Sequence, residues 1–247
     1  MPILIKHPTD SDVLTISASA GNFQFNSESP GKDCYLNGFI AKPWGHEYRV
    51  YCDYFFDIWK LRLSPGETTS MHCHVRKDTV LLCLAGQGTT SFLDGETVPI
   101  SAGSFVYIER GVFHRTQAAP DSHLDLIEVE NPRNKFDLLR VGDDYGRTAK
   151  GYEPTAVSHE GLEPMREMGR AILYRSRDVT GAYTFDVTRL ASDHHSDATL
   201  RAAVLMDIQH HLSGRISLVV PGRHDFAEHI GSLALLIREG TFANGTP

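Results

Sequence analysis

The residues best suited to chemistry lie in the stretch MHCHVRKDTVLLCLAG, at positions 71–86. His72 and His74 are two residues apart, and alternate residues of a β-strand point to the same side, so this pair would present two imidazoles together. Imidazole is a good ligand for Zn²⁺, Fe²⁺, Ni²⁺ and Cu²⁺. Because the chain has 13 histidines, one such pair indicates a metal site only with a third ligand and a scaffold.

A third histidine follows a second turn-rich stretch, GSFVYIERGVFH, at positions 103–114. The two stretches together resemble the two motifs of the cupin superfamily, G-x5-H-x-H-x(3,4)-E-x6-G and G-x5-P-x-G-x2-H-x3-N. The matching residues are Gly66, His72, His74 and Gly86 in the first motif and Gly103, Gly111 and His114 in the second. The resemblance implies a β-barrel in which the three histidines bind a divalent transition metal, with Zn, Fe or Ni as the candidates.

The chain departs from the motifs at the carboxylate ligand. Thr79 occupies the usual glutamate position, and the neighbouring acid is Asp78. A slip of one residue turns a strand side chain to the opposite face, so Asp78 reaches the metal only through a local distortion. We expect the ligands His72, His74, His114 and Asp78, and the alternative is a metal-free barrel in which the histidines are ordinary polar residues.

A narrower resemblance covers roughly residues 38–150. KPWGHEYRVY at 42–51, KLRLSPGETTSMHCH at 60–74 and RVGDDYGR at 140–147 resemble the cupins known as type II mannose-6-phosphate isomerases. This resemblance implies a metal-dependent enzyme that isomerises or epimerises a sugar phosphate or nucleotide sugar. The alternatives are a non-haem iron dioxygenase with a three-histidine site and a non-catalytic sugar-binding cupin.

Isomerisation requires a base near neutral pKa and a positive centre at the substrate oxygens. The candidate bases are, in this order, Glu109 at the expected barrel mouth, Glu47 and Asp78. Lys60 and Arg62 alternate with leucines and should share one side of their strand. If that side is the interior, we expect Lys60 to be catalytic and Arg62 to bind substrate; the alternative is a structural ion pair. The further substrate-binding candidates, which could instead be rim or core residues, are Lys77, Arg110 and Tyr107.

These side chains need a scaffold of short strands separated by turns, which the first ~150 residues indicate. The expected strands are Leu14–Ser17, Arg49–Tyr54, Phe56–Leu63, Val80–Ala85, Thr89–Leu93, Gly103–Ile108 and Leu124–Glu130. Their spacing near ten residues is typical of an antiparallel barrel. The predicted fold class is therefore mainly β, with an antiparallel cupin (jelly-roll) β-barrel at residues 1–150.

Residues 151–247 follow a different pattern, which predicts a small α/β region. Strands are expected at Ala171–Ser176, Tyr183–Leu190 and Arg215–Val220. Apolar residues spaced by three and four predict helices over Asp197–Leu212 and Phe226–Arg238. No role for this region follows from its sequence.

The composition restricts the classes of partner that we expect for this chain. The net charge of −7, with 22% charged and 41% apolar residues, is ordinary for a soluble globular protein and disfavours nucleic acid as a partner. Four cysteines without a C-x-x-C pair, no secretory signal and no long apolar run predict a cytoplasmic protein that is not bound to a membrane. The expected partners are an anionic sugar substrate and, by analogy with other cupins, a second copy of the chain in a homodimer.

Overall fold

The structure is a computed structural model, which we describe for residues 3–22, 38–53, 55–148, 157–158, 162–168, 171–176 and 182–240. The chain divides into two compact units, Met1–Arg175 and Ser176–Pro247. The domain boundary predicted at residues 150 and 151 lies outside the described residues and stays a prediction. Within the described residues, no helix is both long enough and apolar enough to cross a bilayer.

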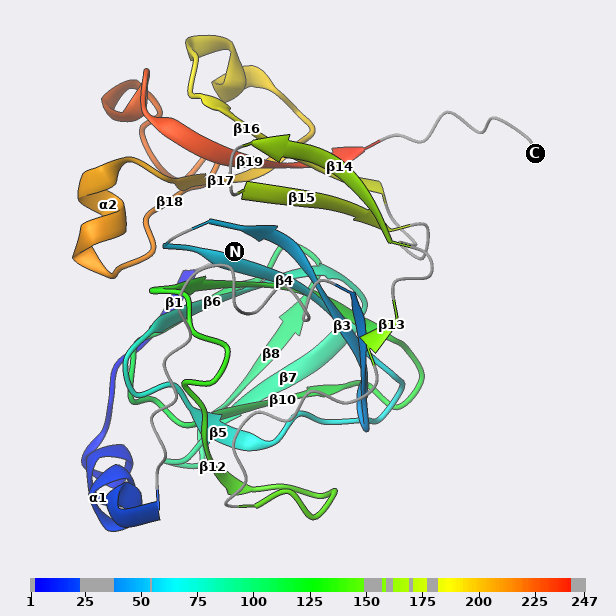
Figure 1. The fold of residues 1–247 in the computed structure, drawn as a ribbon, viewed down its shortest axis with the longest axis vertical. Helices are drawn as coiled ribbons and strands as arrows, with labels where there is room; N and C mark the ends of the chain where they lie inside the picture. Colours follow the sequence, from blue (N-terminus) through cyan, green and yellow to red (C-terminus); the bar gives the residue numbers. More distant parts are fainter. Residues whose placement is uncertain are drawn as a thin grey trace. The chain divides into compact units, whose positions relative to one another are not determined.

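The first unit contains two facing β-sheets (Figure 1). The larger has the order β1-β9-β6-β11-β4-β3-β2-β13, and the smaller has the order β12-β5-β10-β7-β8. All pairings are antiparallel except that of β1 with β9. The strands are β1 (Ile3–Lys6), β2 (Phe39–Lys42), β3 (Gly45–Cys52), β4 (Asp57–Leu63), β5 (Met71–Cys73), β6 (Asp78–Ala85), β7 (Gln87–Phe92), β8 (Thr97–Ser101), β9 (Phe105–Ile108), β10 (His114–Ala118), β11 (Leu124–Asn131), β12 (Leu139–Gly142) and β13 (Val157–Ser158). The mainly β class and the antiparallel barrel are therefore confirmed.

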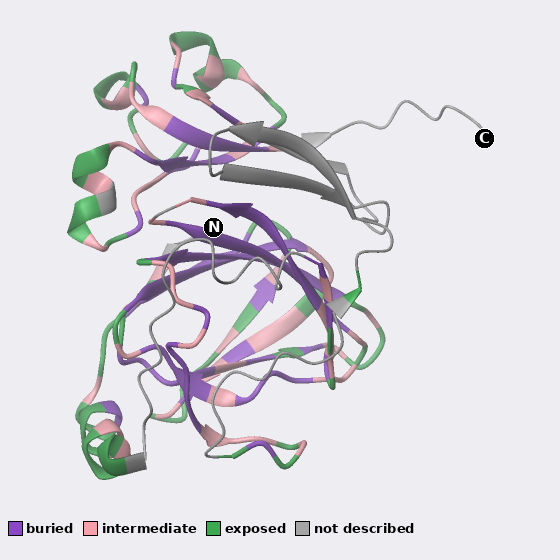
Figure 2. Cartoon of the chain, viewed as in Figure 1, coloured by how far each residue is buried: buried purple, intermediate pink, exposed green. Residues whose placement is uncertain are grey.

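Alternation along the strands fills the space between the sheets. Trp59, Leu61 and Leu63 of β4 belong to one core cluster, to which the other strands also contribute. Because side chains alternate, the residues between them lie on the opposite face of β4. Figure 2 shows that the barrel strands are mostly buried, as a closed core requires.

The KPWG stretch forms a hairpin between β2 and β3. Lys42 pairs with Gly45, which leaves Pro43 and Trp44 as a two-residue connection. Gly45 has φ of 142°, and a Cβ there would lie 2.0 Å from the carbonyl oxygen of Arg62. Glycine is therefore required at this position for a steric reason.

One N-terminal prediction is wrong, because the strand expected at Leu14–Ser17 is part of helix α1 (Asp10–Ser19), which a three-residue 3₁₀ turn, η1 (Ala20–Asn22), extends. Thr9 caps this helix and forms a reciprocal capping box with Asp12. Leu14 is 69% exposed, so its apolar side chain does not mark a buried strand.

The second unit has its own four-stranded antiparallel sheet, ordered β16-β19-β17-β18, and its own apolar cluster. The two predicted long helices are wrong, because each span is divided between elements. Residues 197–212 contain strand β17 and then most of the short helix α2, and residues 226–238 contain a 3₁₀ turn and then most of strand β19. A strand covered on both faces reads as a continuous apolar run, which periodicity does not distinguish from a helix. The elements of this unit are β16 (Ala182–Arg189), η3 (Ser192–Ser196), β17 (Leu200–Leu205), α2 (Ile208–Ser213), β18 (Leu218–Val219), η4 (Ala227–His229) and β19 (Leu233–Gly240). β14 (Leu162–Met168) and β15 (Ala171–Ser176) pair with each other, and all but the last residue of β15 belong to the first unit.

Candidate metal centre and its pocket

Three buried histidines meet inside the barrel. His72 lies on β5, His74 follows the end of that strand, and His114 begins β10. The register places His114 directly opposite His72. The ring centroids are 4.5 Å apart for His72 and His114, 5.1 Å for His72 and His74, and 5.7 Å for His74 and His114. The structure therefore brings the three sequence-predicted histidines together.

Backbone carbonyls fix the orientation of each ring. The Nδ1 atoms of His72, His74 and His114 lie 2.8, 2.6 and 3.1 Å from the carbonyl oxygens of Ser70, Asp137 and Val112. A carbonyl oxygen only accepts hydrogen bonds, so each Nδ1 carries the proton and each Nε2 keeps its lone pair. One ligand nitrogen from each ring lies within 4.8 Å of the other two.

Burial keeps these rings neutral near pH 7. Desolvation lowers the pKa of His72 and His74 well below the ordinary value and lowers the pKa of His114 to about 4. His74 Nε2 is buried and has no hydrogen-bond partner among the described residues. Three neutral imidazoles, one with an unpaired nitrogen, are a donor set that fits a divalent transition metal.

The histidines open into a pocket of the barrel. Its apolar wall includes Trp44, Leu61, Leu81, Leu126 and Leu138. Its other lining residues are Lys42, Glu47, Thr69, Ser70, His72, His74, His114, Thr116, Glu128, Glu130, Lys135, Arg140 and Arg147. The lining thus contains four cationic side chains and three carboxylates beside the histidines, which is suited to a polar, charged ligand.

The pocket charges interact closely. Glu47 lies 3.7 Å from Lys42 and 3.6 Å from Lys135, and Lys135 lies 3.4 Å from Glu128. Burial raises the pKa of Glu128 to about 7 and lowers the pKa of Lys42. Burial would also lower the pKa of Lys135, but the carboxylates of Glu47, Glu130 and Glu128 raise it. The pocket therefore contains one lysine, Lys135, whose positive charge the neighbouring carboxylates stabilise, and one carboxyl group, Glu128, whose pKa lies near neutrality.

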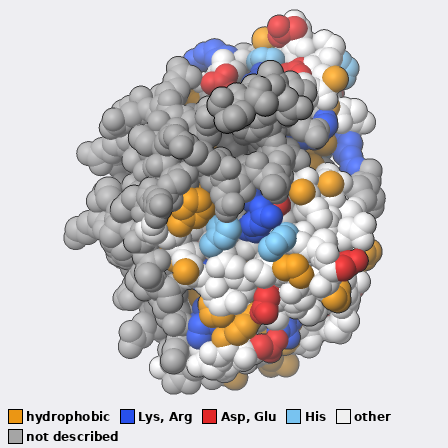
Figure 3. Space-filling view, turned by 90° about the vertical axis from the view of Figure 1, so that its right-hand side faces the viewer, with side chains coloured by type: hydrophobic (Ala, Val, Ile, Leu, Met, Phe, Trp, Pro, Cys, Tyr) orange, Lys and Arg blue, Asp and Glu red, His pale blue; other side chains and the backbone are white. Residues whose placement is uncertain are grey.

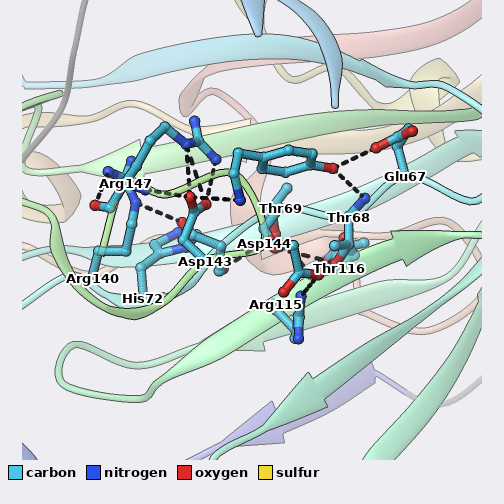
Figure 4. A network of polar contacts seen from close by, with 12 residues as sticks. Glu67, Thr68, Thr69, His72, Arg115, Thr116, Arg140, Asp143, Asp144 and Arg147 are labelled. Atoms are coloured by element: carbon cyan, nitrogen blue, oxygen red, sulfur yellow. Dashed lines mark hydrogen bonds and ion pairs between the residues drawn. The ribbon is translucent and has the colours of Figure 1, made fainter. Parts of the chain in front are cut away.

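The stretch RVGDDYGR places two arginines beside His72 (Figure 4). β12 pairs with β5, so Arg140 lies opposite His72, and its Nε donates to Ser70 Oγ at 3.0 Å. Its Nη1 donates to the carbonyl oxygen of Arg147 at 3.1 Å, and Arg147 forms an ion pair with Asp143 at 2.7 Å. This stretch thus forms a cationic wall of the pocket.

Glu47 is the one predicted catalytic residue that the structure places in the pocket lining. Glu109 lies elsewhere, 2.9 Å from His7 Nδ1, because β1 pairs with β9 and brings the N-terminal segment to this turn. Lys60 and Arg62 face away from Leu61, which lines the pocket, and both pair with Asp125. Lys60 and Arg62 thus form ion pairs in the structure, which was the alternative to substrate contact. The side of β4 that faces the interior instead carries the apolar residues of the core.

The predicted fourth ligand and rim residues form two other clusters. Asp78 accepts hydrogen bonds from the Tyr107 hydroxyl at 2.7 Å and from Arg110 Nε at 3.0 Å. Lys77 is 1% exposed and donates to Glu130 at 2.6 Å, so it is not a solvated rim residue. None of Asp78, Tyr107, Arg110 and Lys77 is among the described residues that line the pocket. The structure therefore does not bring these four residues together with the histidines, as metal ligand for Asp78 or as substrate-binding residues for the other three.

Two carboxylates of the pocket were missed at the sequence level. In LDLIEVEN, the sequence of β11, Leu124, Leu126, Glu128 and Glu130 share one face. Leu124 and Leu126 belong to the barrel core, so the two glutamates point inward with them. Glu128 and Glu130 each have a carboxylate oxygen within 4.8 Å of a nitrogen of His74. The sequence signal for these inward-facing carboxylates is the pair of acids at i and i+2 in an otherwise apolar core strand.

A search of protein families agrees with this geometry: residues 59–130 match the family described as Cupin domain. This match covers the central strands of the barrel. The matched residues run from Trp59 of β4 to Glu130 of β11, so they include all three histidines and both inward glutamates.

The cupin region is also similar to longer proteins of known name. It is 27% identical over 111 residues to the xanthan biosynthesis protein XanB of Xanthomonas campestris pv. campestris, covering 44% of this chain and 24% of that protein. It is 26% identical over 110 residues to a mannose-1-phosphate guanylyltransferase of Escherichia coli K12, covering 44% and 23%. The chain thus spans about a quarter of the length of these relatives.

Two solved structures show how far the structural similarity extends. The polyketide cyclase RemF of Streptomyces resistomycificus is 14% identical with a TM-score of 0.39, over 49% of this chain and 89% of that chain. The capsular polysaccharide assembling protein CapF of Staphylococcus aureus is 20% identical with a TM-score of 0.36, over 40% of this chain and 32% of that chain.

Proposed function

We propose that this cupin is a metal-dependent enzyme that isomerises or epimerises a sugar phosphate or nucleotide sugar. The observation that carries the proposal is that three neutral, converging imidazoles share one pocket with four cationic side chains. The names of two relatives, a mannose-1-phosphate guanylyltransferase and a xanthan biosynthesis protein, support a sugar-linked substrate. Zn, Fe and Ni remain the candidate metals, since imidazole binds all three.

In this proposal, the cationic wall binds the anionic part of the substrate. Arg140 and Arg147 lie on the side of the pocket next to His72, and Lys42 and Lys135 also line it. Buried guanidinium groups bind phosphate oxygens in a fixed geometry. Histidine and Lys or Arg side chains also gather on one face of the molecular surface (Figure 3). The anion would hold the sugar carbons near the histidines and near Glu128.

Glu128 is our candidate for the base that moves the proton between adjacent carbons. Its side chain lines the pocket, and Lys135 lies 3.4 Å from its carboxylate. The apolar wall, including Leu61 and Leu126, would exclude bulk water from the reacting carbons. When bound, the metal would supply a positive charge for the oxygens of an enediolate.

The experiment is a proton-exchange assay in D₂O with metal-loaded protein and mannose 6-phosphate, fructose 6-phosphate or a nucleotide sugar. Isomerisation through an enediolate replaces a carbon-bound proton of the sugar by deuterium, which proton NMR detects. We expect Glu128→Gln to lower the exchange rate by ~10²–10⁴-fold, as for loss of a general base. We expect the matched variant Glu109→Gln, outside the pocket lining, to keep the rate within about threefold.

Two outcomes would contradict the proposed reaction, and a third would contradict the proposed base. Absence of both deuterium exchange and isomer formation with every tested sugar would exclude the isomerase. Oxygen consumption by the iron-loaded protein would instead support the dioxygenase alternative. A lower exchange rate for Glu109→Gln but not for Glu128→Gln would indicate that the base is Glu109, as expected from the sequence.

A further inference from the structure

The first cupin motif lacks its carboxylate in this chain, because Thr79 occupies that position on β6. Asp78, the adjacent acid, is engaged away from the histidines. Its Oδ2 accepts from the Tyr107 hydroxyl at 2.7 Å, and its Oδ1 accepts from Arg110 N and Nε at 3.1 and 3.0 Å. A carboxylate ligand would therefore have to come from another strand.

Glu130 lies directly opposite Thr79, on the neighbouring strand β11. Opposite residues of an antiparallel pair project to the same face, with Cβ atoms about 4.5–5.5 Å apart. Glu130 thus reaches the space that a glutamate at position 79 would reach. Ligand atoms of His74, Glu128 and Glu130 all lie within 4.8 Å of one another.

Two buried acceptor atoms in this cluster of His74, Glu128 and Glu130 have no hydrogen-bond partner among the described residues. Glu130 Oε1 accepts from Lys77 Nζ at 2.6 Å, whereas Glu130 Oε2 is buried without a hydrogen-bond partner among the described residues. The same holds for Nε2 of His74. Both atoms are lone-pair acceptors, since the Nδ1 of His74 carries the ring proton. Two buried acceptors without donors are costly unless a cation lies between them.

We propose that Glu130 is the carboxylate ligand of this metal centre, supplied from β11 in place of the acid missing at Thr79. The inference rests on the metal site proposed above but not on the proposed reaction. Lys77 also donates to the carbonyl oxygen of Asn134 at 3.0 Å. It therefore binds Glu130 by Oε1 from a fixed position, and Oε2 keeps no hydrogen-bond partner among the described residues. Glu128 differs, because its Oε2 lies within hydrogen-bond distance of Lys135.

The test is a titration of metal-free protein with Zn²⁺ or Co²⁺ against a competing chelator, with the visible spectrum of bound Co²⁺ recorded for each variant. Glu130→Gln should weaken binding by more than the roughly 10–100-fold that loss of an outer-shell partner costs, and it should change the Co²⁺ spectrum. The double variant Thr79→Glu/Glu130→Thr should recover most of the affinity, because it returns the acid to the motif position. Glu128→Gln should keep the wild-type spectrum.

A second double variant separates a ligand from a mere counter-ion of Lys77. Lys77→Met/Glu130→Gln removes the buried ion pair as a whole, so it leaves neither charge unpaired. Affinity that stays low supports the inference, and affinity restored to the wild-type value overturns it. Unchanged affinity and spectrum in Glu130→Gln, with binding lost in His114→Ala, would overturn this inference alone. A wild-type protein that binds no metal would overturn the proposed site as well.

Discussion

Among single residues, Arg140 shows how the position of a side chain in a sheet decides its role. Arginine occurs throughout this chain, but Arg140 is buried, lies opposite His72 and lines the pocket. Arg115, which belongs to the same polar network in Figure 4, pairs instead with the exposed Asp144 at 2.6 Å. The two arginines therefore differ in access to a ligand, although they lie close in the fold.

We expect Arg140→Gln to raise the KM for a phosphorylated sugar about tenfold or more, with a smaller change in kcat. The reason is that a hydrogen bond to a charged group contributes ~1.5–3 kcal/mol to binding. Steady-state kinetics measure both constants. Arg115→Gln is the matched control, and its KM should stay within about twofold; equal effects of the two substitutions would refute the anion-binding role of Arg140.

Single residues also explain what sequence reasoning found and missed. The three histidines were predictable because their spacing in two motifs is preserved. Lys60 and Arg62 were expected on one side of β4, and they do share a side, but the alternation itself did not tell which side was interior. Asp78 was expected near the metal, whereas the acids near His74 are Glu128 and Glu130, which lie fifty residues or so further along the chain. Pairing of distant strands decides such contacts.

At the scale of elements, a glycine turn connects the two sheets of the barrel. Gly86 ends β6 with φ of 84°, and a Cβ there would lie 1.9 Å from the carbonyl oxygen of His123. Both the positive φ and the close approach require a residue without a side chain. This turn connects the two sheets, since β6 and β7 lie in different ones.

We expect Gly86→Ala to lower the free energy of unfolding by about 2–4 kcal/mol, from backbone strain and the clash with His123 together. Gly95→Ala is the matched control, because Gly95 has φ of 87° but no neighbouring atom within 4 Å of its added Cβ. Its loss should be nearer ~1 kcal/mol. Denaturant unfolding of both variants measures the difference, and equal losses would show that the clash contributes nothing.

In the second unit, an ion pair connects the loop before β17 to β19. Asp197 accepts hydrogen bonds from Thr199 and from Arg238 Nε, the latter at 2.7 Å, and these bonds lower the pKa of Asp197 to about 2. The ordinary pKa of an aspartate is near 3.9. A lowered folded-state pKa stabilises the fold above the unfolded-state pKa, and this contribution is lost as the pH falls through the folded-state pKa.

Asp197→Asn should therefore lower the unfolding free energy near pH 7 by about 1 kcal/mol, a small value because solvent screens this partly exposed pair. The difference between Asp197→Asn and the wild type should shrink between about pH 4 and pH 2. Thermal unfolding followed at several pH values checks this expectation. A difference that stays constant down to pH 2 would show that the carboxylate is not the cause.

The errors in the second unit have one physical origin. β17 and β19 each contain four consecutive buried apolar residues, from Ala202 to Leu205 and from Ala234 to Ile237. Apolar residues at every position contain both a period of two and a period near four, so a helix pattern can be read into them. The barrel was predictable because many of its strands are separated by glycine turns and match known motifs.

For the whole molecule, the candidate site lies entirely within the first unit. Every residue that lines the pocket falls between Lys42 and Arg147, whereas the second unit begins at Ser176. The chemistry proposed for the cupin domain therefore depends on this part of the chain. The expected homodimer stays a prediction.

The central claim is that His72, His74 and His114 together bind one transition-metal ion, and elemental analysis of metal-loaded, extensively dialysed protein tests it most directly. The account predicts about one ion per wild-type chain, the same for the exposed control His123→Ala, and almost none for His114→Ala. A His114→Ala protein that keeps its metal, or a wild-type protein that binds none, would contradict it.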